Sequence, residues 1–192
     1  MTPALQIFIF AGLFSPGPNV ILLLASGARF GLRATLAHLF GVVIGVGVIG
    51  GVVGLGLGTL LMAVPILETI LLAVSVAWIF WMAWGLWRSS VALVRDTDRP
   101  MTFFEAILFQ WVNPKIWAVA VAAAAYLIGA APIRQAAEIG ISMLVINLFV
   151  CFFWTSFGHL LSGVLSGPRA RKVFFRVMSG LLALSAVLLV VT

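Results

Sequence analysis

Two short motifs interrupt long apolar stretches of this sequence, Ser15-Pro-Gly-Pro-Asn19 and Asn113-Pro-Lys115. In a helix, proline removes a backbone donor and clashes with the preceding turn, and glycine loosens the chain. Each motif should therefore free carbonyl and N–H groups from helical hydrogen bonds. A half-helix that begins after such a break directs the positive end of its dipole toward the break. The two motifs predict a place where a substrate carboxylate binds.

The polar side chains of these motifs could hold the rest of a substrate and move a proton. Asn19 and Asn113 offer donors and acceptors without the desolvation cost of a charge, and we expect them to orient an ammonium group. Lys115 is the only charged residue near the middle of an apolar stretch, where a charge costs about 2.5 kcal/mol or more. We therefore expect Lys115 to face the interior and to bind substrate or to titrate. A lysine stem that snorkels to an interface is the alternative.

Further polar residues complete the predicted site. Gln110 and Trp117 lie about one turn from the second motif and are expected to be cavity walls. Asn147 lies at mid-depth of the fifth apolar stretch, where its amide must bond either to another helix or to the substrate. The predicted substrate-binding residues are Pro16, Gly17, Pro18, Asn19, Gln110, Asn113, Pro114, Lys115 and Asn147.

Two histidines are further candidates for proton coupling or gating. His38 lies near the start of the second apolar stretch and His159 near the end of the fifth, so both should lie near one membrane face. If they face each other, they could form a pH-sensitive gate, or they could bind a b-type haem in a membrane oxidoreductase subunit. Two unconnected interfacial histidines are the simpler interpretation.

The composition indicates a membrane protein. Of 192 residues, 64% are hydrophobic and 8% are charged, with a mean hydropathy of +1.25, whereas soluble domains are roughly 45–50% apolar and 25% charged. So few charges cannot cover a soluble surface, which excludes the soluble enzyme classes. The length has room for six spans of about 20 residues and for no separate domain. We therefore expect one transmembrane domain over residues 1–192.

Other function classes lack the residues that they require. The single cysteine, Cys151, can form neither an internal disulfide nor a thiolate metal site. The net charge of +6 comes from scattered residues and not from a basic helix face, which argues against nucleic acid. No Gly-rich phosphate loop is present, which excludes ATP-driven transport by this chain alone. We expect no catalytic residue, metal or cofactor. A non-transporting assembly subunit, the remaining alternative, would not need two matched breaks.

Six helices are predicted from the apolar runs. The spacing Thr102-Phe-Phe-Glu105 predicts a capping box at the start of the fourth. Pro16 and Pro114 are 98 residues apart, and each opens a group of three helices, so the second group must be inverted relative to the first. The predicted fold is an all-α integral membrane protein of two inverted three-helix repeats, about residues 1–95 and 96–192, with helices one and four broken. The predicted helices are residues 4–28, 34–62, 66–87, 103–130, 135–163 and 173–192.

Positive charges predict the orientation. Apart from Arg134 and the mid-depth Lys115, every Arg and Lys lies on one side of the predicted membrane domain. The positive-inside rule places that side in the cytoplasm. Both termini should then lie outside. The second helix also carries Gly41-x-x-x-Gly45 and Gly54-x-x-x-Gly58, which predict close packing within one subunit or, alternatively, a homodimer interface. The cytoplasmic charges are Arg29, Arg33, Arg88, Arg95, Arg99, Arg169, Arg171, Lys172 and Arg176.

The two motifs resemble those of the LysE/RhtB family of bacterial amino-acid exporters, and the resemblance covers nearly the whole chain. The Pro-Gly-Pro-Asn motif falls on residues 16–19 and the Asn-Pro-Lys motif on residues 113–115. Residues 77–88 resemble the aromatic end of the family's third helix, and residues 176–183 the start of its last helix. The resemblance implies export of amino acids or close derivatives across the bacterial inner membrane, driven by the proton gradient. Both termini would then be periplasmic.

The substrate class follows from the same resemblance. Some lysine-exporting members carry an acidic residue in the second helix, whereas residues 41–58 contain no polar side chain. Residues 109–115 and 157–160 are similar to the branch that exports cysteine and O-acetylserine, with threonine or homoserine exporters next. We therefore expect a small neutral amino acid as the substrate and proton antiport, with Lys115 as the coupling residue.

Overall fold

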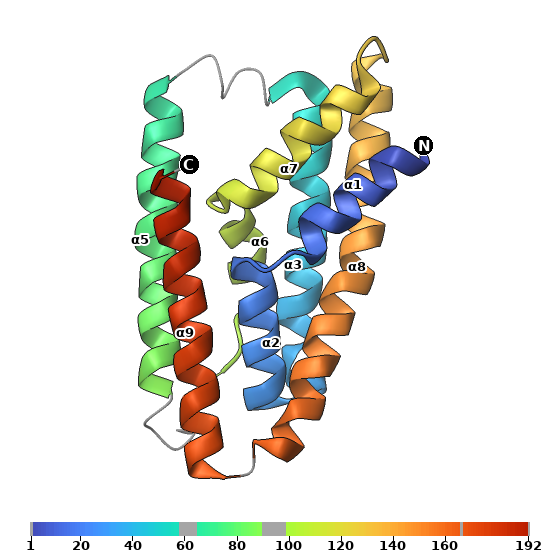
Figure 1. Ribbon diagram of the computed structural model, residues 1–192. Helices are drawn as coiled ribbons and strands as arrows, with labels where there is room; N and C mark the ends of the chain where they lie inside the picture. The colour runs from blue at the N-terminus through green and yellow to red at the C-terminus, as the bar shows by residue number, and fades with distance from the viewer. Residues whose placement is uncertain (1, 58–64, 90–98, 166, 192) are drawn as a thin grey trace.

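The computed structural model describes residues 2–57, 65–89, 99–165 and 167–191, and these residues are helical, without strands (Figure 1). A π-helical turn, η1 (Val53–Leu57), follows α3, and a 3-10 turn, η2 (Ala125–Leu127), follows α7. The all-α fold predicted from the sequence is confirmed. The helices are α1 (Pro3–Phe14), α2 (Pro18–Phe30), α3 (Leu32–Val52), α5 (Pro65–Ser89), α6 (Phe103–Trp111), α7 (Pro114–Ala124), α8 (Pro132–Val164) and α9 (Pro168–Val191).

Long apolar helices form the membrane part of the protein. α3 with η1 has 26 residues and α8 has 33, and each is long and apolar enough to cross a membrane. α1 with α2, and α6 with α7, pass the same test as pairs that are bent by 57° and 62°. The predicted breaks in helices one and four are therefore confirmed. α5 and α9, with 25 and 24 residues, are the two further helices that we expect to span.

Two helix ends differ most from the prediction. The last helix begins at Pro168 and not at Val173, because a proline at the first helical position has no N–H to lose and already has a helical φ. Its basic residues therefore lie in the first turns of the helix. The second predicted helix changes to η1 at Val53, where Gly56 has a φ of +98°. Its predicted end at residue 62, and that of the last helix at residue 192, lie outside the described residues.

The capping box predicted at the fourth helix is present at the start of α6. Thr102 Oγ1 accepts a hydrogen bond from the backbone N–H of Glu105, and Glu105 Oε2 accepts one from the N–H of Thr102 at 2.7 Å. Arg99 donates to both carboxylate oxygens of Glu105 at 2.7 Å. This hydrogen-bonded pairing raises the pKa of Arg99 above its ordinary value. These local contacts fix where α6 begins.

Glycines bring the backbones of α3 and α6 into contact. A Cβ atom at Gly41 would collide with the carbonyl of Phe103, and one at Gly45 would lie 2.6 Å from Cγ of Gln110. These two glycines therefore serve packing within the subunit, the first of the two roles predicted for them. Gly58 lies outside the described residues.

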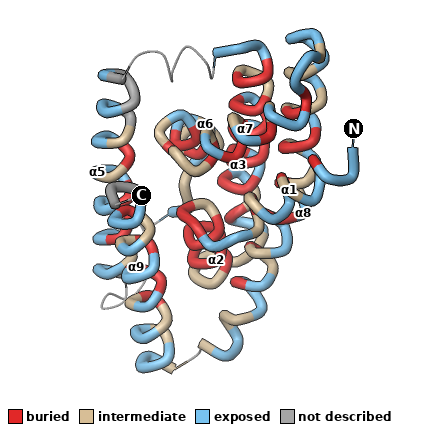
Figure 2. The backbone as a smooth tube through the Cα atoms, turned by 45° about the horizontal axis from the view of Figure 1, so that its top comes forward, coloured by how far each residue is buried: buried red, intermediate tan, exposed pale blue. Residues whose placement is uncertain are grey.

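α2 is held against α8 in the same way. A Cβ atom at Gly27 would collide with the carbonyl of Thr155, and one at Gly158 with the carbonyl of Leu24. Figure 2 shows buried residues along most of α2, which packs against α3, α8 and α9. The second half of the first broken span is therefore fixed in the centre of the bundle.

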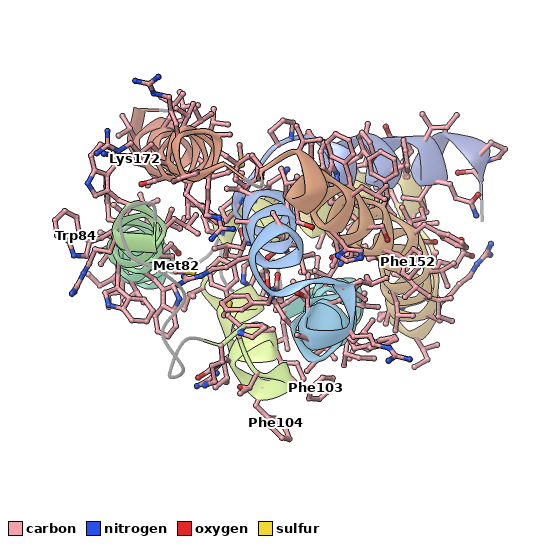
Figure 3. All side chains as sticks on the ribbon, turned by 90° about the horizontal axis from the view of Figure 1, so that it is seen from below. Met82, Trp84, Phe103, Phe104, Phe152 and Lys172 are labelled. Atoms are coloured by element: carbon pink, nitrogen blue, oxygen red, sulfur yellow. The ribbon has the colours of Figure 1, made fainter. Side chains whose placement is uncertain are left out.

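α5 and α9 form a pair beside the other helices (Figures 1 and 3). Ser179 Oγ of α9 donates to the carbonyl of Ala83 of α5 at 2.7 Å. Seen from below, Met82 lies on the side of the other helices and Trp84, which is 61% exposed, points away from them (Figure 3). An outward tryptophan is expected where a helix faces lipid near an interface.

Candidate functional site

The two helix breaks come together in the middle of the bundle. α2 restarts at Pro18 and α7 restarts at Pro114, each with the proline at the first helical position. Pro18 and Pro114 therefore hold the same position in their helices, whereas Pro16 lies between α1 and α2. A proline at this position leaves no intrahelical hydrogen bond unmade, which is why both helices can restart there. Asn113, the residue before α7, makes no side-chain capping bond.

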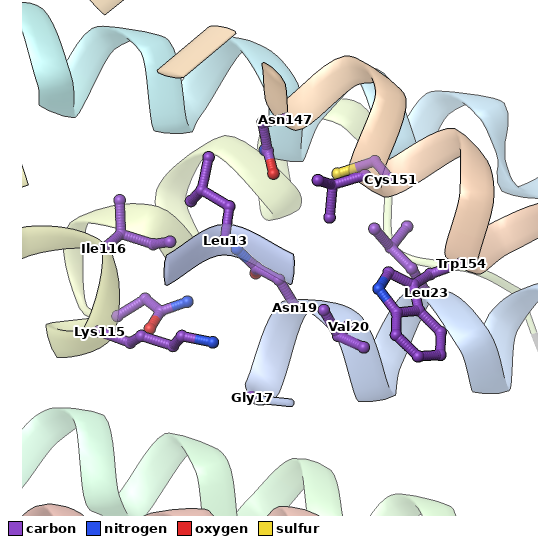
Figure 4. Close-up of a pocket in the computed structure, with 12 residues that line it drawn as sticks. Leu13, Gly17, Asn19, Val20, Leu23, Lys115, Ile116, Asn147, Cys151 and Trp154 are labelled. Atoms are coloured by element: carbon purple, nitrogen blue, oxygen red, sulfur yellow. The ribbon is translucent and has the colours of Figure 1, made fainter. Parts of the chain in front are cut away.

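Lys115 of α7 binds backbone carbonyls at the first break. Its ammonium donates to the carbonyl of Ser15 at 2.6 Å and lies 3.4 Å from the carbonyl of Pro16. In a membrane, carbonyls freed from a helix need such a partner. Lys115 is half-buried and its ammonium points toward Gly17 (Figure 4), so its stem does not snorkel along α7 to an interface.

Gly17 provides the room that the lysine needs. A Cβ atom at Gly17 would lie 2.9 Å from both Cδ and Nζ of Lys115. The backbone of Gly17 is extended, with a φ of −177°, and any residue can adopt that conformation. A side chain at residue 17 would therefore displace the end of Lys115 from the first break, and the glycine leaves that space open.

Asn19 and Gln110 join the two broken helices through a reciprocal pair of amide hydrogen bonds. Asn19 Nδ2 donates to Gln110 Oε1 at 2.8 Å, and Gln110 Nε2 donates to Asn19 Oδ1 at 3.2 Å. Gln110 Nε2 also donates to the carbonyl of Ala106 at 2.9 Å. Gln110 is fully buried, and its two hydrogen bonds keep the side chain of Asn19 in position.

The carbonyls at the second break also have partners. Ser75 of α5 donates to the carbonyl of Val112. Trp117 Nε1 donates to the carbonyl of Trp111 at 3.0 Å. Trp117, which we expected to be a cavity wall, therefore ties the two halves of the broken span together.

A small pocket lies between the two breaks and the middle of α8 (Figure 4). Its volume is about 10 Å³, which is room for about one water molecule. An amino acid cannot enter until the helices move apart, so the site is closed in this conformation. The lining residues are Leu13, Gly17, Asn19, Val20, Leu23, Asn113, Lys115, Ile116, Asn147, Val150, Cys151 and Trp154.

The predicted site residues divide into two groups. Gly17, Asn19, Asn113, Lys115 and Asn147 all line the pocket, although they come from distant parts of the chain. The others do not line it but support the residues that do. These are Pro16, Pro18, Gln110 and Pro114.

Three polar side chains of the pocket carry buried atoms without a hydrogen-bond partner in the described part of the chain. These atoms are Nδ2 and Oδ1 of Asn113, Nδ2 of Asn147 and Nε1 of Trp154. An unsatisfied buried polar group costs about 1–3 kcal/mol, so each one needs an explanation such as a ligand or water that completes it. Three of these four atoms belong to N–H donor groups and one, Oδ1 of Asn113, is an acceptor, and their residues line the pocket together with Lys115.

Trp154 and Cys151 are pocket residues that the sequence reasoning missed. Together with Asn147 they follow the helical spacing i, i+4 and i+7, which places all three on one face of α8. That spacing, counted from the mid-depth asparagine, is the signal that could have identified them.

The two histidines lie in different surroundings. His38 of α3 is buried, and neither ring nitrogen has a hydrogen-bond partner among the described residues. His159 of α8 is exposed, and its Nδ1 lies 3.6 Å from the position that a Cβ of Gly31 would take. Neither histidine lines the pocket between the two breaks.

Two bent spans that meet around a closed pocket, among long apolar helices, are an arrangement typical of membrane transporters. The chain matches the LysE type translocator family over residues 10–192, and it belongs to that family. The resemblance predicted from the motifs is therefore confirmed. The protein is a transporter and not an enzyme, which removes the oxidoreductase and the assembly subunit as alternatives.

Curated relatives cover nearly the same length. The chain is 26% identical to the homoserine/homoserine lactone efflux protein of Salmonella typhi over 182 residues, which cover 91% of this chain and 88% of that protein. It is 29% identical to the cysteine/O-acetylserine efflux protein of Salmonella paratyphi A over 174 residues, which cover 88% of this chain and 85% of that protein. No solved structure matches the chain.

Proposed function

We propose that this protein exports small neutral amino acids from the cytoplasm across the bacterial inner membrane in exchange for protons. The pocket between the two breaks is the observation that carries the proposal. Its lining contains one cation, Lys115, and no carboxylate, so a cationic substrate would find no counter-ion there. The named relatives are efflux proteins for homoserine and its lactone and for cysteine and O-acetylserine, which supports the same substrate class.

In this proposal the substrate carboxylate replaces the carbonyl of Ser15 as the partner of Lys115. The first N–H groups of α2 and α7 have no partner within their helices and add positive potential at the same place. A charge-assisted hydrogen bond to a carboxylate is stronger than one to a neutral carbonyl. The substrate ammonium then lies against Oδ1 of Asn113, the unused acceptor of the pocket.

Coupling follows if a proton and the substrate compete for the site around Lys115. Lys115 is neutral while its Nζ donates to the bound carboxylate, and it takes up a proton from outside as the amino acid leaves. The empty site then carries that proton inward, which gives antiport with one residue in two roles. Release of the amino acid frees Lys115 to return to the carbonyl of Ser15, 2.6 Å away in the closed conformation. His38 and His159 are proposed to form a pH-sensitive gate on the cytoplasmic side.

Proteoliposomes containing the purified protein test this function. We expect labelled serine, threonine, homoserine, cysteine and O-acetylserine to leave the vesicles faster than lysine or glutamate. Because protons exchange for substrate, efflux should accelerate when the outer solution is made acidic, and a protonophore should remove that acceleration. Efflux of lysine as fast as that of the neutral amino acids would refute the substrate class. An efflux rate that does not change with the pH gradient would refute proton antiport.

The orientation of the chain gives a second expected result. Both ends of the chain lie toward the same side of the bundle, opposite the start of α9 (Figure 1). The positive-inside rule makes that common side the periplasm. A periplasm-active reporter fused after residue 192 should therefore be active, and one inserted near residue 95 should be inactive. A reporter after residue 192 that is active only in the cytoplasm would contradict the predicted orientation.

A further inference from the structure

We propose that Trp154 of α8 determines which side chains the transporter accepts, by donating its indole N–H to an oxygen on the substrate side chain. The inference rests on the proposed function and names a more specific substrate class. Amino acids whose side chain carries a hydroxyl or ester oxygen should be preferred over hydrocarbon analogues of the same size.

The indole ring of Trp154 is held in a fixed position by other aromatic rings. Its centroid lies 5.2 Å from that of Phe14 at the end of α1, 5.4 Å from Phe153 and 6.2 Å from Phe157. Its Nε1 atom is buried and has no hydrogen-bond partner among the described residues. The nitrogen edge of the ring lies on the pocket side (Figure 4). A fixed donor that faces a ligand pocket without a partner indicates an acceptor on the ligand.

Trp154 lies at the opposite end of the pocket from Lys115 (Figure 4). A substrate whose carboxylate is bound at Lys115 therefore extends its side chain toward the indole. The lining also includes the apolar side chains of Val20, Leu23 and Val150, which suit the methylene groups of a short side chain. A hydrocarbon side chain would fill this space but leave the indole N–H buried and unpaired, and such sites discriminate against the analogue that lacks the polar group.

Asn147 strengthens the same preference. Its Nδ2 atom is a second buried donor without a partner in the described residues, and it lies two turns before Trp154 on the same face of α8. The two donors can both bind an oxygen acceptor on the substrate side chain. Because Asn147 remains when Trp154 is replaced, we expect the preference to weaken and not to disappear.

The test compares matched amino acids in proteoliposomes containing the wild-type protein or Trp154→Phe. Phenylalanine keeps an aromatic ring against Phe14 and removes the N–H. The pairs are threonine with valine, and homoserine with 2-aminopentanoate, which have similar size and differ in the hydroxyl. We expect the wild-type protein to prefer the hydroxyl member, and Trp154→Phe to reduce the ratio of initial rates by roughly three- to tenfold, the factor that one neutral hydrogen bond contributes.

Trp81→Phe is the matched control, because Trp81 of α5 is 67% exposed and does not line the pocket. This control should leave both the rates and their ratio unchanged. If Trp154→Phe slows both members of each pair equally, or leaves the ratio unchanged, the proposal is overturned. A wild-type protein without a preference for the hydroxyl member would overturn it as well.

The only cysteine of the chain separates failure of this inference from failure of the proposed function. Cys151 is buried and lines the pocket, so N-ethylmaleimide should alkylate it only when the helices move apart during transport. A bound substrate should slow that alkylation. If threonine protects Cys151 but Trp154→Phe leaves the selectivity intact, the site is correct and the assignment of Trp154 is wrong. If no neutral amino acid protects Cys151 or is exported, the proposed function itself fails.

Discussion

Replacing Lys115 by methionine is expected to abolish proton-coupled export while the protein still inserts into the membrane. Methionine keeps an unbranched stem and removes the ammonium that donates to the carbonyl of Ser15 at 2.6 Å. The substrate carboxylate then loses the Nζ donor, and the site loses its titratable group. A hydrogen bond to a charged group contributes about 1.5–3 kcal/mol, which corresponds to a roughly 10- to 150-fold lower initial rate of efflux. Efflux from proteoliposomes with and without a pH gradient measures this effect.

Two further variants make the result interpretable. Lys115→Arg keeps a permanent positive charge, so it should bind substrate but lose the response to the pH gradient. Lys172→Met removes an exposed lysine from the first turns of α9 and should export normally. If Lys115→Met still concentrates substrate outside in response to a pH gradient, Lys115 is only a structural tie to the carbonyls at the first break.

Asn113→Ala is expected to reduce export by a similar factor with little loss of stability. The side chain is fully buried, and neither amide atom has a hydrogen-bond partner among the described residues. Truncation therefore breaks no hydrogen bond of the folded state, but it removes the proposed acceptor for the substrate ammonium. A hydrogen bond to a charged group again corresponds to about 1.5–3 kcal/mol. Efflux rates and thermal unfolding in detergent measure the two effects separately.

Asn19→Ala is the matched comparison, because this asparagine is already paired. Its loss breaks the two hydrogen bonds to Gln110, at 2.8 and 3.2 Å, and should lower the free energy of unfolding by about 1–3 kcal/mol. Asn113→Ala should therefore unfold at a higher temperature than Asn19→Ala. If both variants export at the wild-type rate, the substrate site lies elsewhere. If Asn113→Ala is the less stable of the two, Asn113 has a structural role.

The sequence by itself determined the features that depend on local geometry. Pro18 and Pro114 cannot occupy a helix interior, so the breaks were predictable from single residues and the structure has them. The capping box of Thr102 and Glu105 depends on a spacing of three residues and was predictable for the same reason. The motifs around the breaks also indicated the family, and the match over residues 10–192 confirms it.

Only the tertiary structure decided which groups meet at the breaks. Lys115 and the carbonyl of Ser15 are 100 residues apart, and Asn19 and Gln110 are 91 residues apart. No local rule pairs such residues, because their contact depends on how α2, α3 and α8 pack through the glycines that bring their backbones together. Trp154 also lines the pocket only because α8 packs against the breaks. Its sequence environment is that of any aromatic residue in an apolar helix, whereas its unpaired N–H becomes visible only once its neighbours are in place.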